Sequence, residues 1–252
     1  MALITLNFYS QSLGMQSEVL VIMPQQFSQG EIGITKNVSD TAYKTLYLLH
    51  GLSDDHTIWL RRTSIERYAA EYGICVVMPC AGRSFYCDMK DGMAYYTYIA
   101  KELPAIIREF FHVSHKREDT FVAGLSMGGY GALKIALKEP DSFCAAAALS
   151  PCCDLKAARF ESILQSIFGK PEMPKEEDVC FLAKLQEDNP NKPRLYVAMG
   201  TEDFLYNNIQ PFRKQLENSS YDFTYLEKPT DHNWAFWDSQ IQDVLKWMFQ
   251  TR

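Results

Sequence analysis

Long apolar runs are missing from this sequence, since none approaches the roughly eighteen residues of a membrane-spanning helix. A surplus of basic residues is missing as well, because 25 Lys and Arg stand against 31 Asp and Glu, for a formal net charge of -6. That balance argues against a nucleic acid or an anionic membrane as a partner. The N-terminus has neither a basic start nor a long apolar core, so we expect no signal peptide and a cytoplasmic protein.

Cysteine patterns that signal a disulfide framework or a zinc site are also lacking. The seven cysteines are odd in number, and the C-x-x-C spacing does not occur. We therefore expect reduced, mostly buried thiols. No group of Cys, His and Asp residues has ligand spacing, so we expect no metal site.

Strand-like apolar runs alternate with helical segments along the whole chain. This alternation predicts a mostly parallel sheet, opened by an antiparallel pair and covered by helices on both faces. The segment 155–190 interrupts the pattern as a charge-rich helical insertion, and residues 1–252 are expected to form one domain. The expected strands are 3–9, 18–23, 44–50, 74–79, 120–124, 144–150, 194–200 and 221–228, and the expected helices are 60–72, 95–110, 127–138, 205–217 and 234–249.

Glycine is sparse, with 13 residues in 252, yet two of them flank a single serine in "GLSMG" at 124–128. This segment fits G-x-S-x-G and lies between an expected strand and an expected helix. In a nucleophile elbow the serine occupies a strained strand-to-helix turn, so neighbouring positions must lack side chains. The same motif also occurs in ordinary glycine-rich turns, so a catalytic interpretation of Ser126 requires partner residues.

One histidine stands in the expected position for a partner. A serine hydroxyl needs a base to accept its proton, and the base needs an acid that holds its tautomer. In folds with this elbow the chain order is Ser, acid, His. His232 is the histidine that follows Ser126, whereas the other four histidines lie upstream. We therefore predict that His232 is the base.

Three acidic residues compete for the third role. Asp203 follows a buried strand, which is where open α/β sheets deliver catalytic groups. Asp154 follows the preceding strand and remains an alternative. Asp231 directly precedes His232 and is ranked last, because an acid adjacent in sequence rarely reaches the ring nitrogen. We predict Asp203.

Two backbone N–H groups are expected to form an oxyanion hole, which stabilises the charge of the tetrahedral intermediate. One belongs to Met127, directly after the nucleophile. The other is expected in the loop that follows the strand at 44–50, where the pair His50-Gly51 lets the N–H of Leu52 turn toward the substrate.

The sequence resembles the esterase D family of α/β-hydrolases, above all its bacterial tributyrin esterases and acetylesterases, with S-formylglutathione hydrolases and cinnamoyl or feruloyl esterases as relatives. The resemblance runs from about residue 5 to residue 250 and rests on "LYLLHGLSDDHTIW", "SFYCDMKDGMAYYTYIAKELPAIIREFF", "GLSMGGYGAL", "GTEDFL" and "DHNWAFWD", in that order. It implies an α/β-hydrolase fold of eight strands with little or no cap, and a serine esterase that needs no cofactor. It also implies the roles given above and self-association as a homodimer or homotetramer.

Aromatic residues near the expected strand ends are candidates for the substrate pocket: Trp59, Phe85, Tyr86, Phe204 and Trp234. For Trp234, Phe236 and Trp237 the competing interpretation is that they form the buried face of the last helix, and this interpretation is favoured because aromatic residues dominate cores.

The expected substrate is a small carboxylic ester with an acetyl to butyryl group, because the insertion at 155–190 lacks the continuous apolar face of a lipase lid. Cinnamoyl or feruloyl esters and S-formylglutathione are the alternatives. Leu125 stands where S-formylglutathione hydrolases usually have His, which disfavours the thioester. Acyl transfer and a non-catalytic binding module are the remaining possibilities.

Overall fold

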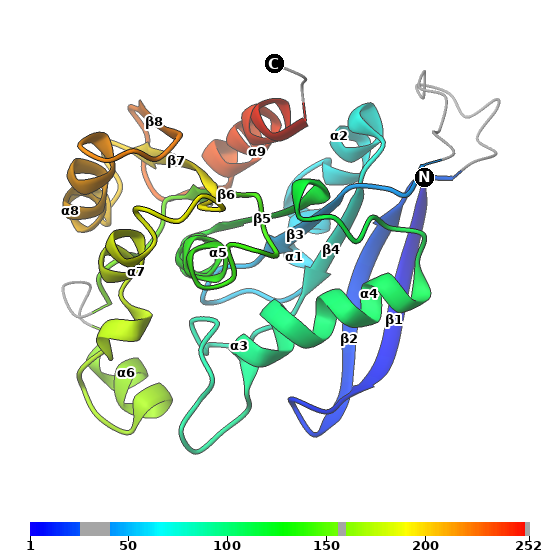
Figure 1. The fold of residues 1–252 in the computed structure, drawn as a ribbon, viewed down its shortest axis with the longest axis horizontal. Helices are drawn as coiled ribbons and strands as arrows, with labels where there is room; N and C mark the ends of the chain where they lie inside the picture. Colours follow the sequence, from blue (N-terminus) through cyan, green and yellow to red (C-terminus); the bar gives the residue numbers. More distant parts are fainter. Residues whose placement is uncertain (26–40, 156–159, 250–252) are drawn as a thin grey trace.

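The computed structural model describes residues 1–25, 41–155 and 160–249, whose strands form one eight-stranded sheet in the order β1-β2-β4-β3-β5-β6-β7-β8 (Figure 1). β2 pairs antiparallel with β1 and β4, and the remaining neighbours are parallel. The expected mostly parallel sheet of eight strands, opened by an antiparallel pair, is thereby confirmed. The strands are β1 Ala2–Ser10, β2 Met15–Met23, β3 Thr45–Leu49, β4 Cys75–Pro79, β5 Thr120–Leu125, β6 Ala145–Leu149, β7 Arg194–Gly200 and β8 Phe223–Lys228.

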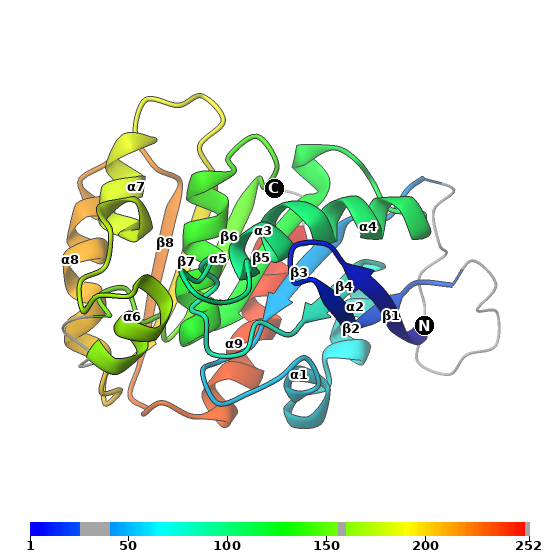
Figure 2. The same ribbon diagram turned by 90° about the horizontal axis from the view of Figure 1, so that it is seen from below.

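Both faces of the central strands are buried, which explains their continuous apolar sequences. Successive side chains of a strand point to opposite faces. In β3, Tyr47 and Leu49 belong to the core beneath α4 (Leu103–Phe110) and α5 (Met127–Lys138). Leu46 and Leu48 belong to the core beneath α2 (Ile65–Tyr72) and α9 (Trp234–Phe249). Figure 2 shows these two groups of helices on opposite sides of the sheet.

The expected helix at 60–72 is wrong in one respect, because the structure breaks it into α1 (Ile58–Arg62) and α2. Thr63, with φ -138° and ψ 173°, is extended rather than helical. Its hydroxyl donates to the carbonyl of Trp59 at 2.6 Å and accepts the N–H of Ile65 at 3.1 Å. One threonine side chain therefore satisfies groups at the end of α1 and the start of α2.

The expected helix at 95–110 is continuous but not uniform. It consists of α3 (Tyr95–Thr97), a wider π-helical turn η1 (Tyr98–Glu102) and α4. Pro104 lacks an N–H and would crowd the carbonyl of Ala100 in a regular α-helix. The π turn includes Ala100 and ends two residues before this proline, which accounts for the local widening.

The insertion at 155–190 contains α6 (Glu161–Phe168), the short 3-10 turn η3 (Lys175–Glu177) and α7 (Val179–Leu185). A buried ion pair fastens it to α5: Nζ of Lys134, with a fully buried side chain, lies 2.7 Å from Oε2 of Glu177. Lys138 contacts the other carboxylate oxygen at 2.8 Å, and the Tyr130 hydroxyl donates to the Glu177 carbonyl at 2.7 Å. The remaining chain contributes α8 (Tyr206–Glu217), which contacts β8 and α7.

We expect Glu177→Gln to lower the free energy of unfolding at pH 7 by about 3–5 kcal/mol, because it leaves the Lys134 ammonium buried without its counterion. Burial alone would raise the pKa of Glu177, but Lys134 and Lys138 outweigh it and lower that pKa. The carboxylate therefore stabilises the fold above its unfolded pKa of about 4.3, and this contribution is lost as the pH falls through the lower folded value.

Urea unfolding at pH 7 and at decreasing pH measures this effect, with the exposed neighbour Glu176→Gln as the matched control. The gap between wild type and Glu177→Gln should close in acid. Equal free energies of unfolding for Glu177→Gln and Glu176→Gln at pH 7 would contradict the prediction.

Candidate active site

Ser126 lies where β5 ends and α5 begins, and its backbone is strained, with φ 52° and ψ -116°. Positive φ is costly for a residue other than glycine and persists only where the surroundings hold it. Here the N–H of Ser126 donates to the Leu149 carbonyl at 2.8 Å, and its carbonyl accepts the N–H of Tyr130 at 3.1 Å. The turn is thus held by β6 on one side and by α5 on the other.

The two glycines around Ser126 are required by close backbone contacts. A Cβ on Gly128 would lie 2.6 Å from the carbonyl oxygens of both Leu49 and His50. A Cβ on Gly124 would lie 2.4 Å from the carbonyl oxygen of Gly128. The first turn of α5 therefore rests directly on the end of β3, and this contact explains the G-x-S-x-G spacing.

The loop after β3 passes beside Ser126. A Cβ on Gly51 would lie 2.7 Å from Cδ1 of Leu125 and 3.8 Å from Cβ of Ser126. The next residue, Leu52, carries an N–H that has no protein acceptor within the described ranges. The N–H of Met127, in the first turn of α5, likewise has no intrahelical partner. Of the two expected oxyanion donors, Met127 thus directly follows the serine in the chain, and Leu52 directly follows Gly51, which lies beside it.

His50 holds this loop in place, a role that the sequence did not indicate. Its Nδ1 lies 2.7 Å from the Gly51 carbonyl, and its Nε2 accepts the N–H of Ala81 at 2.9 Å. Burial lowers the pKa of His50, so the ring is neutral and acts as one donor and one acceptor. The Tyr86 hydroxyl adds a hydrogen bond to the His50 carbonyl at 2.8 Å.

His232 and Asp203 meet across the ends of two strands. Asp203 follows β7, and His232 lies between β8 and α9. The Nδ1 atom of His232 lies 2.7 Å from Oδ2 of Asp203, whose side chain is fully buried. The other carboxylate oxygen of Asp203 accepts the N–H of Leu205 at 2.8 Å. The carboxylate is therefore oriented by its own loop and by the imidazole.

Asp154 and Asp231, the two alternative acids, are exposed rather than buried. Asp154 is exposed, and its N–H donates to the side-chain oxygen of Asn208 at 2.9 Å. Asp231 is also exposed, and its carboxylate accepts a hydrogen bond from the side chain of Asn233. Of the three candidates, the geometry favours Asp203 as the partner of the His232 ring.

A chain of contacts connects His232 to the turn at Ser126. The His232 ring packs edge-on against Trp237, with centroids 4.8 Å apart. The indole N–H of Trp237 donates to the hydroxyl of Ser150 at 3.1 Å. Ser150 directly follows Leu149, whose carbonyl accepts the N–H of Ser126. The three predicted residues thus gather at the carboxyl ends of the parallel strands, as open α/β sheets require.

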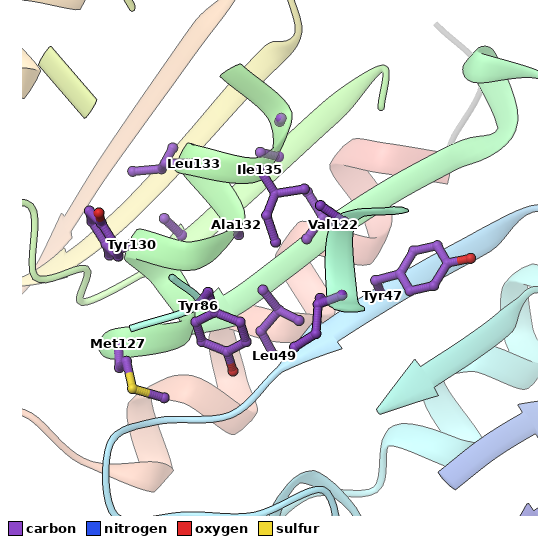
Figure 3. Packing of buried hydrophobic residues seen from close by; sticks show 14 of the residues in the cluster. Tyr47, Leu49, Tyr86, Val122, Met127, Tyr130, Ala132, Leu133 and Ile135 are labelled. Atoms are coloured by element: carbon purple, nitrogen blue, oxygen red, sulfur yellow. The ribbon is translucent and has the colours of Figure 1, made fainter. Parts of the chain in front are cut away.

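The aromatic pocket candidates fall into two groups. Trp59 lies in α1, so its expected position on a strand-end loop is wrong, and its buried indole donates to the Leu49 carbonyl at 3.0 Å. Phe85 and Tyr86 do lie in the loop after β4, but both side chains are buried in the core, where Figure 3 shows Tyr86 with other members of the cluster. These three side chains therefore pack in the core of the protein and do not face solvent as pocket residues would.

The second group borders His232. Trp234 is half-buried and packs edge-on against Trp59 and Trp237, with centroids 5.3 and 5.2 Å apart. Phe204 is 70% exposed, and its ring centroid lies 4.8 Å from that of His232. Phe236 and Trp237 are buried, as the core-packing interpretation expects.

All seven cysteines are free thiols, as the sequence predicts. Within residues 1–25, 41–155 and 160–249, no three His, Cys, Asp or Glu side chains are placed to hold a metal ion together. No helix in this part of the chain has the length and apolar character needed to cross a bilayer.

Comparison with known proteins shows the family to which this chain belongs. The family model described as "Putative esterase" matches residues 10–248. An acetyl esterase of Caldicellulosiruptor saccharolyticus is 30% identical, over 98% of each chain. Two structures from Staphylococcus aureus match over 99% of each chain: fluorophosphonate-binding serine hydrolase F with bound substrate (33% identity, TM-score 0.88) and S-formylglutathione hydrolase (35% identity, TM-score 0.85).

A ferulic acid esterase matches at 22% identity with a TM-score of 0.78, which shows a common fold. The family match spans nearly the whole chain, and the eight-stranded, mostly parallel sheet is that of these neighbours. This chain therefore belongs to the esterase family of α/β-hydrolases and is a carboxylic ester hydrolase.

Proposed function

We propose that this enzyme is a serine esterase that hydrolyses short-chain carboxylic esters, from acetyl to butyryl, through an acyl-enzyme on Ser126. The observation that carries the proposal is the contact between His232 and the buried Asp203 at the sheet edge where Ser126 occupies its strained turn. The acetyl esterase relative supports the acyl size, and a fluorophosphonate-binding neighbour supports the serine mechanism.

In the proposed acylation step, the Ser126 hydroxyl oxygen attacks the ester carbonyl while Nε2 of His232 takes the hydroxyl proton. Asp203 accepts a hydrogen bond from Nδ1–H of His232, which keeps Nε2 free to act as the base and stabilises the imidazolium. The carbon–oxygen bond to the alcohol then breaks, and His232 returns the proton to the departing alcohol oxygen. Water repeats the sequence in deacylation, so that the acid leaves and Ser126 is restored.

The negative charge of the tetrahedral intermediate is expected to meet the N–H groups of Leu52 and Met127. Neither needs to break a hydrogen bond within the described part of the protein. Met127 directly follows Ser126, and Leu52 directly follows Gly51, on which a Cβ would lie 3.8 Å from Cβ of Ser126. The Met127 N–H also lies at the N-terminus of the 12-residue helix α5, where the helix dipole favours an anion. Such preorganised donors stabilise the transition state more than the ground state.

S-formylglutathione is a second candidate substrate, because a neighbour of that name is 35% identical over 99% of the chain. Feruloyl esters have weaker support, since the ferulic acid esterase shares the fold at 22% identity.

The paired Asp203 and His232 favour catalysis over a binding module. Hydrolysis rather than acyl transfer, cytoplasmic location and assembly into dimers or tetramers stay part of the proposal.

The acyl preference has a structural reason in the insertion. Most apolar side chains of its helices lie in the core, since α6 buries Ile163, Leu164 and Ile167, and α7 buries Val179 and Leu182. Leu185, the last residue of α7, is the exception at 64% exposed. The buried residues are unavailable to cover a long-chain groove. The exposed part of the insertion is rich in Lys and Glu, as in "GKPEMPKEED" at 169–178.

With p-nitrophenyl esters from acetate to palmitate, kcat/KM is expected to peak by about four carbons and then to level off or fall. A continuous apolar groove would add about 0.8 kcal/mol for each methylene, or roughly fourfold in kcat/KM per carbon. Without such a groove, further methylenes meet solvent or a wall. Measuring the series by initial rates, with each rate normalised to fluorophosphonate-titrated sites, tests the proposed substrate class.

Methyl ferulate and S-formylglutathione complete the panel and separate the alternatives. A preference of more than about a hundredfold for either one, equivalent to ~2.7 kcal/mol, would replace the short-chain proposal. A steady climb to octanoate or beyond would also overturn it.

A further inference from the structure

Phe204 is the most exposed large hydrophobic side chain in the described part of the protein, at 70%. Exposure alone is ordinary for a single apolar residue. What distinguishes Phe204 is its contact with His232, since the two ring centroids are 4.8 Å apart with an interplanar angle of 56°. Phe110, at 59% exposed, offers a useful contrast because it ends α4.

The surroundings of His232 define which side of its ring faces solvent. Asp203 is bound at Nδ1, and the buried Trp237 packs edge-on against the ring. Phe204 is the exposed member of this group, and the His232 side chain itself is 18% exposed. Phe204 is therefore a solvent-exposed aromatic ring in contact with the His232 imidazole.

The chemistry of acylation places one half of the ester beside this pair of rings. The departing alcohol oxygen must come within hydrogen-bond reach of the imidazole that protonates it. The acyl carbon is bonded to Ser126 instead, beside the glycines of the elbow. The alcohol half therefore lies next to His232 during acylation and is absent during deacylation.

We propose that Phe204 is a specificity-determining residue for the alcohol half of the ester, and that it selects aryl or other flat apolar leaving groups. The ring offers an apolar face to the leaving group, and aromatic pairs favour offset or tilted contacts at such distances. This inference rests on the proposed acyl-enzyme mechanism and concerns the alcohol half, which that mechanism leaves open.

Comparing Phe204→Ala with wild type on acetates that differ in the alcohol tests the inference. We expect kcat/KM to fall about tenfold for 1-naphthyl acetate and less than about twofold for methyl acetate. Dividing each variant rate by the wild-type rate for the same ester cancels the different reactivities of the two alcohols. Phe204→Trp should keep the aryl preference, and Phe110→Ala should match wild type on both esters.

Pre-steady-state bursts with p-nitrophenyl acetate separate specificity from a merely structural role. The alcohol has departed before deacylation, so breakdown of the acetyl-enzyme should be unchanged in Phe204→Ala. A role limited to positioning His232 would slow acylation and deacylation together, since both steps use that ring.

The outcomes are distinct. Equal losses on both acetates, or slower deacylation, would refute the inference while leaving the esterase proposal intact. Hydrolysis of both acetates that persists in Ser126→Ala would refute the proposed mechanism, and the inference with it. An aryl-selective loss with unchanged deacylation supports both.

Discussion

Ser126→Ala should remain folded while kcat falls by about 10⁴- to 10⁶-fold, the range seen when a catalytic serine is removed from comparable triads. The change deletes only the hydroxyl oxygen, which makes no hydrogen bond to another of the described residues. Serine and alanine both carry a Cβ, so the strain at φ 52° is similar in the two proteins. The turn keeps its backbone bonds to Leu149 and Tyr130.

Covalent labelling by a fluorophosphonate, read by intact-protein mass spectrometry, measures the loss of the nucleophile directly. Ser150→Ala is the matched control, because Ser150 also has positive φ, at 47°, and also follows a parallel strand. That variant should still label once per chain, at Ser126. Stoichiometric labelling of Ser126→Ala would exclude Ser126 as the nucleophile.

Asp203→Asn should lower kcat by about 10³- to 10⁴-fold at neutral pH with little loss of structure. The amide oxygen can still accept the N–H of Leu205, so the amide nitrogen faces Nδ1 of His232. An amide N–H there requires an unprotonated Nδ1, which places the proton of the neutral ring on Nε2. The ring then presents a proton to Ser126 where the mechanism needs a lone pair.

Asp154→Asn and Asp231→Asn are the controls, since each removes one exposed carboxylate near the same sheet edge. Both variants should keep kcat within about threefold of wild type, as surface substitutions usually do. Circular dichroism and the urea midpoint establish that all three proteins are folded. Loss of activity in Asp154→Asn with activity retained in Asp203→Asn would reverse the assignment.

The strands were predictable because their physical cause is local. A parallel strand buried on both faces must be apolar along its whole length, and "CVVMP" and "AAAAL" satisfy that requirement without reference to distant residues. The order of Ser126, Asp203 and His232 was predictable for a related reason. Each follows a strand, and the carboxyl ends of parallel strands share one edge.

The features that sequence reasoning missed depend on contacts between distant segments. Thr63 ends one helix and begins the next through its hydroxyl, which a periodic apolar pattern does not reveal. His50 was considered only as part of a flexible turn, whereas its Nε2 is held by Ala81, which lies 31 positions away. Trp59 and Tyr86 are buried with their polar atoms bound to the carbonyls of Leu49 and His50. The sequence alone does not show that these side chains have such partners.

The contact between α5 and β3 also limits where new activity can be engineered into this enzyme. Gly124 and Gly128 admit no side chain, and Leu125 and Met127 are buried, so the residues around Ser126 tolerate little variation. In a directed-evolution library at 124–128, most variants would not fold. Diversity is better placed at exposed positions, such as Ser53 in the loop after β3 and Phe204 after β7.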